Sequence, residues 1–357
     1  MAKAQIKGVR IEGLHTTVGA VEKRIDDELD ALGGDVAQLE RIKKAIGLEK
    51  RRIAAPGSTS LDLGQQAVSR LLSELDVEAT DCDALIFVTQ TPDYFQPCNA
   101  AVLHGKLGMG KGAAAFDVNL GCSGYVYGLY LGHLMVAHGG CSKVMLVAAD
   151  TISRIVNPRD RTVAPLFGDA GSATLLCASE DSSPAYFALH TDGSGWEAIA
   201  QPSGAFREPV TEASQKENTD AEGNTRARTN LHMNGADVFN FSIREEPIAI
   251  REILEYAELD AGQVDAFIFH QANRYIIGNI AKRLKIDPAQ APADTVSRYG
   301  NQSSASIPGA ICDTQAQRLA EASLQWVLSG FGVGLSWASA AVQVARGTYA
   351  GLDIQET

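Results

Sequence analysis

The spacing of apolar and polar residues along the chain predicts alternating helices and strands. Apolar residues recur every three or four positions in 60–75, which predicts an amphipathic helix with Ser60 as its N-cap. The short apolar runs 83–91 and 143–150 predict buried strands. The charged segment 18–47 predicts helices near the start of the chain. Such alternation is typical of α/β architecture.

Two short motifs occur twice in the same order, which indicates an internal duplication. The repeated pairs are DALIF at 83–87 with DAFIF at 265–269, and LFGDAGSATLL at 166–176 with GFGVGLSWASA at 330–340. Two copies of one α/β unit would account for a length of 357 residues. We therefore expect two similar halves, 1–178 and 179–357. The polar stretch 206–230 is expected to be a surface excursion.

Composition and charge argue against several classes of function. Hydrophobic residues make up 45% of the chain and charged residues 21%, which is ordinary for a globular protein. A net charge of −12 argues against nucleic acid or an anionic membrane as a partner. The longest apolar stretch, near 125–137, contains His133 and is too short to span a membrane. The six cysteines form no CxxC pair or zinc-finger spacing, so we expect free thiols, no metal and a cytoplasmic protein.

Cys122 lies where a predicted strand gives way to a predicted helix. The residues before it, AAAFDVN at 113–119, are mostly small and apolar, and the helix that starts at or near Cys122 is almost wholly apolar. A helix N-terminus lowers the pKa of a thiol through its free N–H groups, and the same groups can bind an oxyanion. Gly121 and Gly124 would let a substrate approach the backbone. A small buried core residue is the alternative, because free cysteines are often buried.

The second half places a histidine and an asparagine after comparable elements. His270 ends an apolar run and is followed by Gln271 and Asn273, which is typical of sites at strand ends in α/β proteins. Asn301 lies in a Gly-Asn turn before a helix of small residues. Related positions in duplicated halves would meet across a pseudo-twofold axis, which would bring Cys122, His270 and Asn301 together. Taken singly, a turn asparagine and a strand-capping histidine are more often structural.

Several motifs together resemble the β-ketoacyl-acyl carrier protein synthase III family, whose members have the thiolase fold. The match runs nearly end to end through AFDVNLGCSGYVYGL, LFGDAGSATLL, MNGADVFNFSIRE, FIFHQANRYIIGNIAKRL, YGNQSSASIPGAI and GFGVGLSWASA. The resemblance implies a five-layered αβαβα domain of two similar halves, and a homodimer. It also implies a Cys-His-Asn triad, which falls on Cys122, His270 and Asn301.

The resemblance implies decarboxylative condensation in fatty-acid, polyketide or specialised lipid biosynthesis, with no cofactor. Cys122 would take an acyl group from a thioester of coenzyme A or of acyl carrier protein, and a malonyl thioester would then lose CO₂. His270 and Asn301 would hold the resulting enolate oxygen without a metal. The N–H groups of Cys122 and Val333 would hold the second oxyanion. Phe331 would be the apolar neighbour that disfavours the malonyl carboxylate.

Three positions bear on the acyl primer and its carrier. In the family an early tryptophan stacks on the adenine of coenzyme A, but residues 36–55 contain no aromatic side chain and Arg41 falls near that place. The other half of this clamp would be Arg161. Gln96 stands where the family usually has an apolar residue that reaches the partner subunit's acyl pocket. We therefore expect a primer carried by acyl carrier protein, with a short or polar acyl group.

Basic residues on the predicted helix after His270 would dock the acidic acyl carrier protein, by the same resemblance. These residues are Arg274, Lys282, Arg283 and Lys285. The alternative for this set is an ordinary solvated helix face.

Other functions remain open from the residues alone. A same-fold acyltransferase would pass the acyl group from Cys122 to a hydroxyl or amine without decarboxylation, although Asn301 would then be unnecessary. A papain-like protease also orders Cys, His and Asn along the chain. Its cysteine lies near the mature N-terminus and is preceded by a glutamine, and Cys122 shows neither feature. A non-catalytic subunit of a heterodimeric synthase would not need an intact triad. The near-P-loop GKLGMGKG at 105–112 lacks the final Ser or Thr that binds Mg²⁺.

Overall fold

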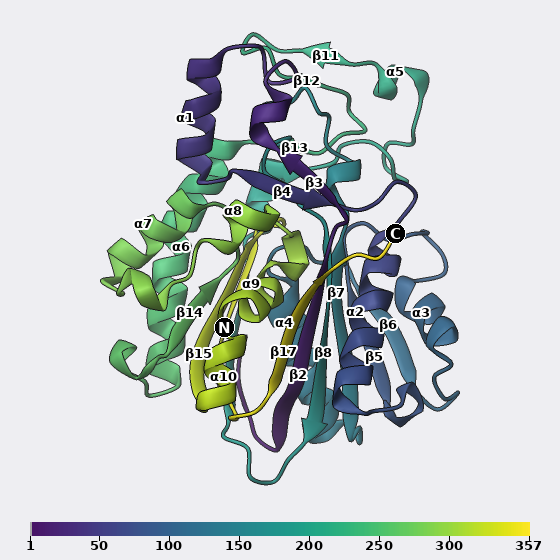
Figure 1. Cartoon of the computed structure of the whole chain (residues 1–357), viewed down its shortest axis with the longest axis vertical. Coiled ribbons are helices and arrows are strands. Elements are labelled where there is room, and N and C mark those ends of the chain that lie inside the picture. Colours follow the sequence, from purple (N-terminus) through teal and green to yellow (C-terminus); the bar gives the residue numbers. More distant parts are fainter. Residues whose placement is uncertain (1) are drawn as a thin grey trace.

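Two β-sheets, packed face to face through a central layer of helices, form the body of the molecule (Figure 1). The computed structural model describes residues 2–357, apart from the side chains at positions 38, 42 and 45. The six-stranded sheet has the order β17 (Tyr349–Ile354), β2 (Val9–Val18), β8 (Ala170–Ala178), β7 (Lys143–Asp150), β5 (Ala84–Val88), β6 (Ala114–Val118). The five-stranded sheet has the order β1 (Ala2–Ile6), β9 (Ala185–Thr191), β16 (Ser336–Val344), β15 (Leu324–Gly332), β14 (Ala266–Phe269).

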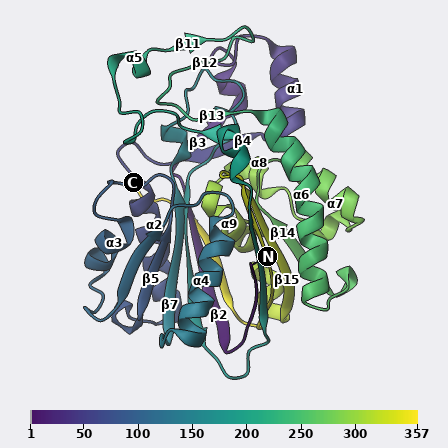
Figure 2. The ribbon, with the colours of Figure 1, turned by 180° about the vertical axis from the view of Figure 1, so that it is seen from behind.

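Helices make up the other three layers. Helices α2 (Ser60–Leu75) and α3 (Asn99–Leu107) cover the outer face of the six-stranded sheet. Helices α4 (Gly124–His138) and α9 (Ser306–Thr314) lie between the sheets, and α6 (Gly235–Tyr256) with α7 (Arg274–Leu284) covers the far side (Figure 2). The predicted five-layered αβαβα fold is therefore confirmed.

The two sheets repeat one topology, as the internal duplication predicts. In each, a parallel pair (β5–β7 or β14–β15) is continued by two antiparallel strands (β8–β2 or β16–β9). The copies differ at one edge. Strand β6 pairs with β5, whereas α8 (Thr295–Tyr299) and an isolated bridge between Asn301 and Phe167 occupy the corresponding stretch of the second half. Because β1 and β17 each cross to the other half's sheet, the boundary at residue 178 stays a prediction.

The apolar helix of the thiol motif is α4, and both sheets bury it. Three glycines on one face, Gly124, Gly128 and Gly132, let it lie close to the six-stranded sheet. A Cβ at Gly124 would come within 2.5 Å of a methyl group of Val88. Contact with strands on both sides explains why α4 has no polar stripe.

Shorter elements form a cap at one end of the sheets (Figure 1). The cap contains α1 (Val36–Ile46), α5 (Glu212–Gln215) and the strand pairs β3 (Val21–Arg24) with β4 (Lys50–Ile53), β10 (Ile199–Ala200) with β13 (His232–Met233), and β11 (Asn218–Thr219) with β12 (Thr225–Arg226). The remaining short helices are α10 (Ala316–Glu321) and the 3-10 turns Ile25–Glu28, Ala79–Asp81, Ile152–Arg154, Gly193–Ala198, Ala261–Gln263, Pro288–Gln290 and Ser303–Ala305. Residues 206–230 lie largely exposed in this cap, so the predicted surface excursion is confirmed.

The prediction of helices throughout 18–47 is wrong at its start. Residues Val21–Arg24 form β3, and the α-helix begins only at Val36. Pairing with β4 supplies the backbone hydrogen bonds, and Glu22 forms an ion pair with Lys50 across the two strands. The charges therefore stabilise a surface ribbon, a tertiary arrangement that local helix propensity cannot indicate.

The N-cap of α2 is Thr59, one residue before the predicted Ser60. The Thr59 N–H donates to the Asp62 carboxylate at 3.0 Å. The Ser60 hydroxyl instead donates to the Thr91 carbonyl oxygen at 2.7 Å, which ties the helix to the loop after β5.

Candidate active site

Cys122 lies in the turn that joins β6 to α4, two residues before the helix begins. Its side chain is buried, with 8% of its surface exposed. The end of β15 packs directly against it, and a Cβ at Gly332 would lie 2.8 Å from the Cys122 Sγ. Glycine at this position therefore allows the β15–β16 turn to reach the thiol.

The thiol of Cys122 is held in its protonated form. Burial raises its pKa to about 12, and the charge of the buried Asp150 carboxylate adds to the shift. Hydrogen bonds from the N–H groups of Val333 and Cys122 and from the Ser303 side chain act in the opposite direction. The N–H donors at the helix start therefore lower this pKa as expected, but the loss of solvation outweighs them and the net pKa is raised. The Val333 N–H does lie beside the sulfur, as the resemblance predicted.

His270 directly follows β14 and is held as a neutral N–H donor. Its Nδ1 lies 2.6 Å from the Ser306 Oγ, and the Gln271 N–H donates to that same oxygen at 3.4 Å. Among the described residues the Ser306 hydroxyl has no other acceptor, so we assign its hydrogen to Nδ1, which leaves the ring proton on Nε2. Burial lowers the pKa of His270 to about 3, so the ring is uncharged near neutral pH.

Asn301 is oriented by the backbone of its own turn. Its Oδ1 accepts the Ser303 N–H at 3.0 Å, so its NH₂ group carries the remaining donors. Its backbone N–H donates to the Leu166 carbonyl at 2.8 Å, and its carbonyl accepts the Gly168 N–H at 3.0 Å. These bonds fasten the second half's turn to the first half.

One cavity brings the predicted residues together. Cys122, His270, Asn301, Phe331 and Val333 all line a space of about 650 Å³. The Phe331 ring meets the His270 ring edge to face, with centroids 5.5 Å apart. Another wall of the cavity is apolar and is formed by Ile46, Ile152, Ile155, Leu166, Phe167, Ile199, Leu231, Met233 and Val238.

The buried carboxylate of Asp150 joins the walls of this cavity. It accepts from the Gln90 N–H at 2.8 Å, from the Thr89 and Thr91 hydroxyls, and from the Ser304 N–H and hydroxyl. Asp150 ends β7, while Ser304 lies close to Asn301 in the other half. This carboxylate therefore sets the loop after β5 against the turn that carries Asn301.

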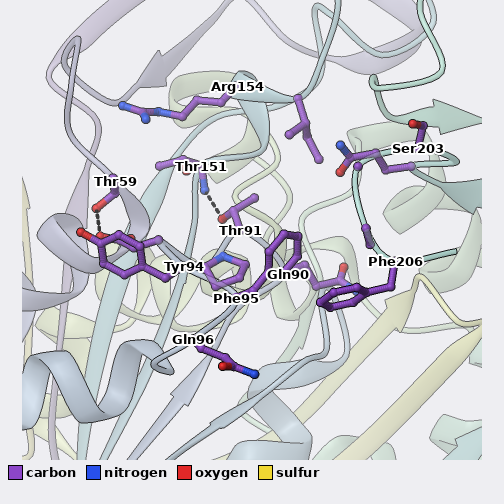
Figure 3. A pocket seen from close by; sticks show the side chains of 16 residues that line it. Thr59, Gln90, Thr91, Tyr94, Phe95, Gln96, Thr151, Arg154, Ser203 and Phe206 are labelled. Atoms are coloured by element: carbon purple, nitrogen blue, oxygen red, sulfur yellow. Dashed lines mark hydrogen bonds between the residues drawn. The ribbon is translucent and has the colours of Figure 1, made fainter. Parts of the chain in front are cut away.

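An open groove of about 830 Å³ adjoins the cavity (Figure 3). The two spaces share Gln90, Pro92, Phe95, Ile155, Gln201 and Ala205. Exposed rings edge the groove: Tyr94 is 57% exposed, and the centroids of Phe95 and Phe206 lie 5.8 Å apart. Gln96 lines the groove and does not line the cavity.

The two arginines of the expected adenine clamp lie outside both spaces. The Arg161 guanidinium packs against backbone, so that a Cβ at Gly33 or Gly223 would come within 3.0 Å of it. Arg41 is exposed on α1. A clamp formed by these side chains stays a prediction.

The basic residues of α7 differ in their surroundings. Arg274 is paired with Asp294, and Arg283 donates to the Ile243 carbonyl, which Pro247 leaves without its helical partner. Arg283 therefore has a structural role. Lys282 and Lys285 are exposed and form no ion pair with any described residue.

Further residues of the site could not be singled out from the sequence. Ser303 and Ser306 lie within YGNQSSASIPGAI and Gln90 lies after DALIF, but their side-chain contacts depend on the tertiary fold. Within residues 2–357, no group of three or more His, Cys, Asp and Glu side chains is placed to hold a metal ion. The described helices include none with the length and apolarity needed to cross a membrane.

Comparisons with known proteins agree with this geometry. Residues 116–193 match the family model described as 3-oxoacyl-[acyl-carrier-protein (ACP)] synthase III, and residues 254–344 match the model of its C-terminal part. A putative 3-oxoacyl-[acyl-carrier-protein] synthase 3 of Campylobacter jejuni is 35% identical over 95% of this chain and 94% of its own length. A beta-ketoacyl-[acyl-carrier-protein] synthase III of Rhodopirellula baltica is 34% identical over 94% of this chain and 98% of its own.

A solved structure shares the whole architecture. The crystal structure of a 3-oxoacyl-(acyl-carrier protein) synthase from Burkholderia xenovorans superposes with a TM-score of 0.93 at 35% identity, covering 99% of both chains. Sequence, topology and the convergence of Cys122, His270 and Asn301 in one cavity thus agree, and the chain belongs to the β-ketoacyl-acyl carrier protein synthase III family.

Proposed function

We propose that this chain is a condensing acyltransferase that extends a Cys122-bound acyl group with a malonyl thioester, in fatty-acid or specialised lipid biosynthesis. The arrangement of donors in one cavity carries the proposal: the N–H groups of Cys122 and Val333 beside the sulfur, and the His270 Nε2–H and Asn301 NH₂ groups. Membership of the synthase III family supports it.

The first step acylates the thiol. The Cys122 sulfur attacks the carbonyl carbon of an acyl thioester, and the N–H groups of Cys122 and Val333 hold the oxyanion that forms. When the intermediate collapses, the carrier leaves as a thiol. The leaving sulfur takes, in the net reaction, the proton that Cys122 gives up, so no acid or base is consumed.

The second step forms the carbon–carbon bond. A malonyl thioester loses CO₂, and its electron pair becomes an enolate whose oxygen accepts from His270 Nε2–H and Asn301 NH₂. The enolate carbon attacks the acyl carbonyl on Cys122, and the oxyanion of the tetrahedral intermediate accepts hydrogen bonds from the N–H groups of Cys122 and Val333. Collapse expels the Cys122 thiolate, which takes one proton from solvent, and releases a 3-oxoacyl thioester.

Phe331 favours loss of CO₂ because of where it lies. It is 1% exposed and its ring faces the edge of His270. A carboxylate beside such a ring loses its hydration without gaining a partner. Departure as neutral CO₂ removes that penalty, so the substrate is less stable there than its product.

The state of His270 disfavours the simple acyltransferase. Transfer of the acyl group to a hydroxyl or amine would be accelerated by a base that accepts a proton beside the thioester. Here Nδ1 is occupied by Ser306 and Nε2 already carries hydrogen, so the ring is set to donate.

Acyl carrier protein is the proposed partner at α7. Lys282 and Lys285 offer exposed, unpaired charge among the described residues at the C-terminal end of α7. Tyr275, at the other end of the same helix, is 58% exposed and lines the cavity. An acidic partner docked there would present its pantetheine arm close to the opening. We further propose that the primer arrives on this carrier, because residues 36–55 lack an aromatic ring for adenine. The ratio of kcat/KM for one acyl group on both carriers tests this preference.

A homodimer in the cytoplasm completes the proposal. Strand β6 forms an edge of the six-stranded sheet with half-buried Phe116 and Val118, a surface that a second copy would cover. All six cysteines are free thiols, which suits a reducing compartment.

Intact-protein mass after exposure to acyl thioesters tests the nucleophile. The wild-type chain is expected to gain one acyl mass, and Cys122→Ala none. Cys312→Ala is the matched control, since that buried thiol lies in α9 outside the cavity, and it should still be acylated. An acyl adduct retained by Cys122→Ala would contradict the assignment.

A further inference from the structure

We infer that Gln90 makes this enzyme selective for acyl primers that carry a hydroxyl or keto oxygen close to the thioester, an inference that rests on the proposed function. Gln90 lines both the cavity that contains Cys122 and the groove that adjoins it. An acyl chain that leaves the thiol toward the groove therefore passes this side chain.

The amide of Gln90 lies next to the reacting centre. A Cβ at Gly121, the residue before Cys122, would come within 2.3 Å of the Gln90 Oε1 and 3.5 Å of the Ser303 Oγ. The Ser303 side chain hydrogen-bonds the Cys122 sulfur, so the Gln90 amide and a partner of the thiol face the same point beside Gly121. A group on the first carbons of the acyl chain is the part that this amide can reach.

The loop holds the backbone of Gln90 rigidly and leaves its side chain available. Its N–H donates to Asp150, and the hydroxyls of Thr89 and Thr91 on either side donate to the same carboxylate. The side-chain amide makes no hydrogen bond to any residue between 2 and 357. It thus has two donors and an acceptor for a ligand.

The groove beyond Gln90 also suits an oxygenated chain. Figure 3 shows Gln90 near the Phe95 and Phe206 rings, with Thr59 and Arg154 at the opposite side. The Gln201 NH₂ group donates to the Thr229 carbonyl, and its amide oxygen accepts no hydrogen bond from a described residue. The groove combines aromatic rings with side-chain amides, and in ligand pockets a few polar groups among apolar ones fix the orientation of the ligand.

An alkyl chain would be the poorer primer for a physical reason. It would displace water from the Gln90 amide and leave donors and an acceptor unpaired, whereas a hydroxyl or keto oxygen would replace the lost hydrogen bonds. Leaving one such group unsatisfied lowers kcat/KM by about ten-fold, and sites built to bind a hydroxyl can discriminate more strongly.

The test compares acylation of Cys122 by butanoyl and 3-hydroxybutanoyl groups on the same pantetheine carrier. We expect the full-length wild-type protein to prefer the hydroxyacyl group by about ten-fold in kcat/KM, followed as intact mass. Gln90→Leu should abolish or reverse that preference, with a faster butanoyl reaction. Gln65→Leu on α2, which lines neither space, is the matched control and should keep it.

The outcomes separate this inference from the proposed function. A wild-type protein that takes butanoyl equally well or better would overturn the role of Gln90 while leaving the condensing enzyme intact. Retention of the hydroxyacyl preference in Gln90→Leu would also overturn the role of Gln90. If Gln96→Leu lost the preference instead, the role would belong to Gln96. If neither primer acylates Cys122, this inference fails, and the proposed function fails with it only if Cys122 also stays unmodified by the other acyl thioesters.

Discussion

Single residues in this site decide which atoms carry hydrogen. The hydrogen bond from Ser306 fixes the His270 proton on Nε2. The Ser303 N–H donates to the Asn301 Oδ1, which fixes the amide orientation and leaves the Asn301 NH₂ group available. Both supports come from the 3-10 turn and helix start that follow Asn301. The enolate site is therefore preorganised by the Ser303 N–H and the Ser306 hydroxyl.

Ser306→Ala tests this positioning role. Without the hydroxyl the His270 proton can move to Nδ1, so we expect the rate of decarboxylation to fall by roughly ten-fold or more. This loss should be smaller than the loss of about 100-fold or more that is typical when an oxyanion donor is deleted. Acylation of Cys122 should be nearly unchanged. The nitrogen-15 shifts of the His270 ring should reveal a mixed tautomer. Ser242→Ala on α6 is the control, and equal losses in both reactions would indicate a general structural defect.

At the scale of elements, α6 carries a buried acid behind the five-stranded sheet. Glu246 is 0% exposed, and the Ser329 hydroxyl donates to its Oε2 at 2.6 Å. Burial raises the pKa of Glu246 to about 8, so the native state keeps it protonated at neutral pH. In the unfolded chain the pKa of Glu246 would be near its ordinary value of 4.5.

Glu246→Gln should therefore change how stability depends on pH. Because the folded pKa is the higher one, the native state binds more protons between about pH 4.5 and 8, and stability falls as pH rises through that window. The slope for one group reaches at most about 1.4 kcal/mol per pH unit. The amide keeps the bond from Ser329 without titrating, so the Tm at pH 8 should rise and its pH dependence flatten. Glu255→Gln, exposed on the same helix, should change neither.

Helix α7 offers a test of carrier docking. Reversing charge with Lys282→Glu and Lys285→Glu should weaken use of a carrier-bound substrate several-fold, because exposed charges set the encounter rate. A short free thioester should react nearly as before, and added salt should narrow the difference. Lys216→Glu in the exposed cap is the control. Equal losses on both substrates, independent of salt, would mean that these residues support the fold.

At the scale of the whole molecule, duplication builds the site. The first half supplies Cys122 from the turn after β6, and the second supplies His270 after β14 and Asn301 before α9. The Asn301 backbone then bonds to Leu166 and Gly168 of the first half. Neither half alone contains the complete set of donors.

Much of this arrangement could be predicted because its signals are local. The short apolar runs predicted the strands β5, β7 and β14, and the repeated DALIF and DAFIF motifs indicated two related halves. The ribbon at Val21–Arg24 could not be predicted, since its partner strand is distant in sequence. The raised pKa of Cys122 and the free amide of Gln90 likewise depend on burial and neighbours from several segments.

Release of labelled CO₂ from a malonyl carrier thioester tests the central claim most directly. Wild-type protein and Asn301→Ala are first acylated, and the mass of each is checked so that both carry the acyl group on Cys122. We expect the variant to accept the acyl group but to release CO₂ about 100- to 1,000-fold more slowly, the effect of removing one donor from an oxyanion site. Release at the wild-type rate from acylated Asn301→Ala would contradict the account, because decarboxylation would then not depend on the donor pair formed with His270.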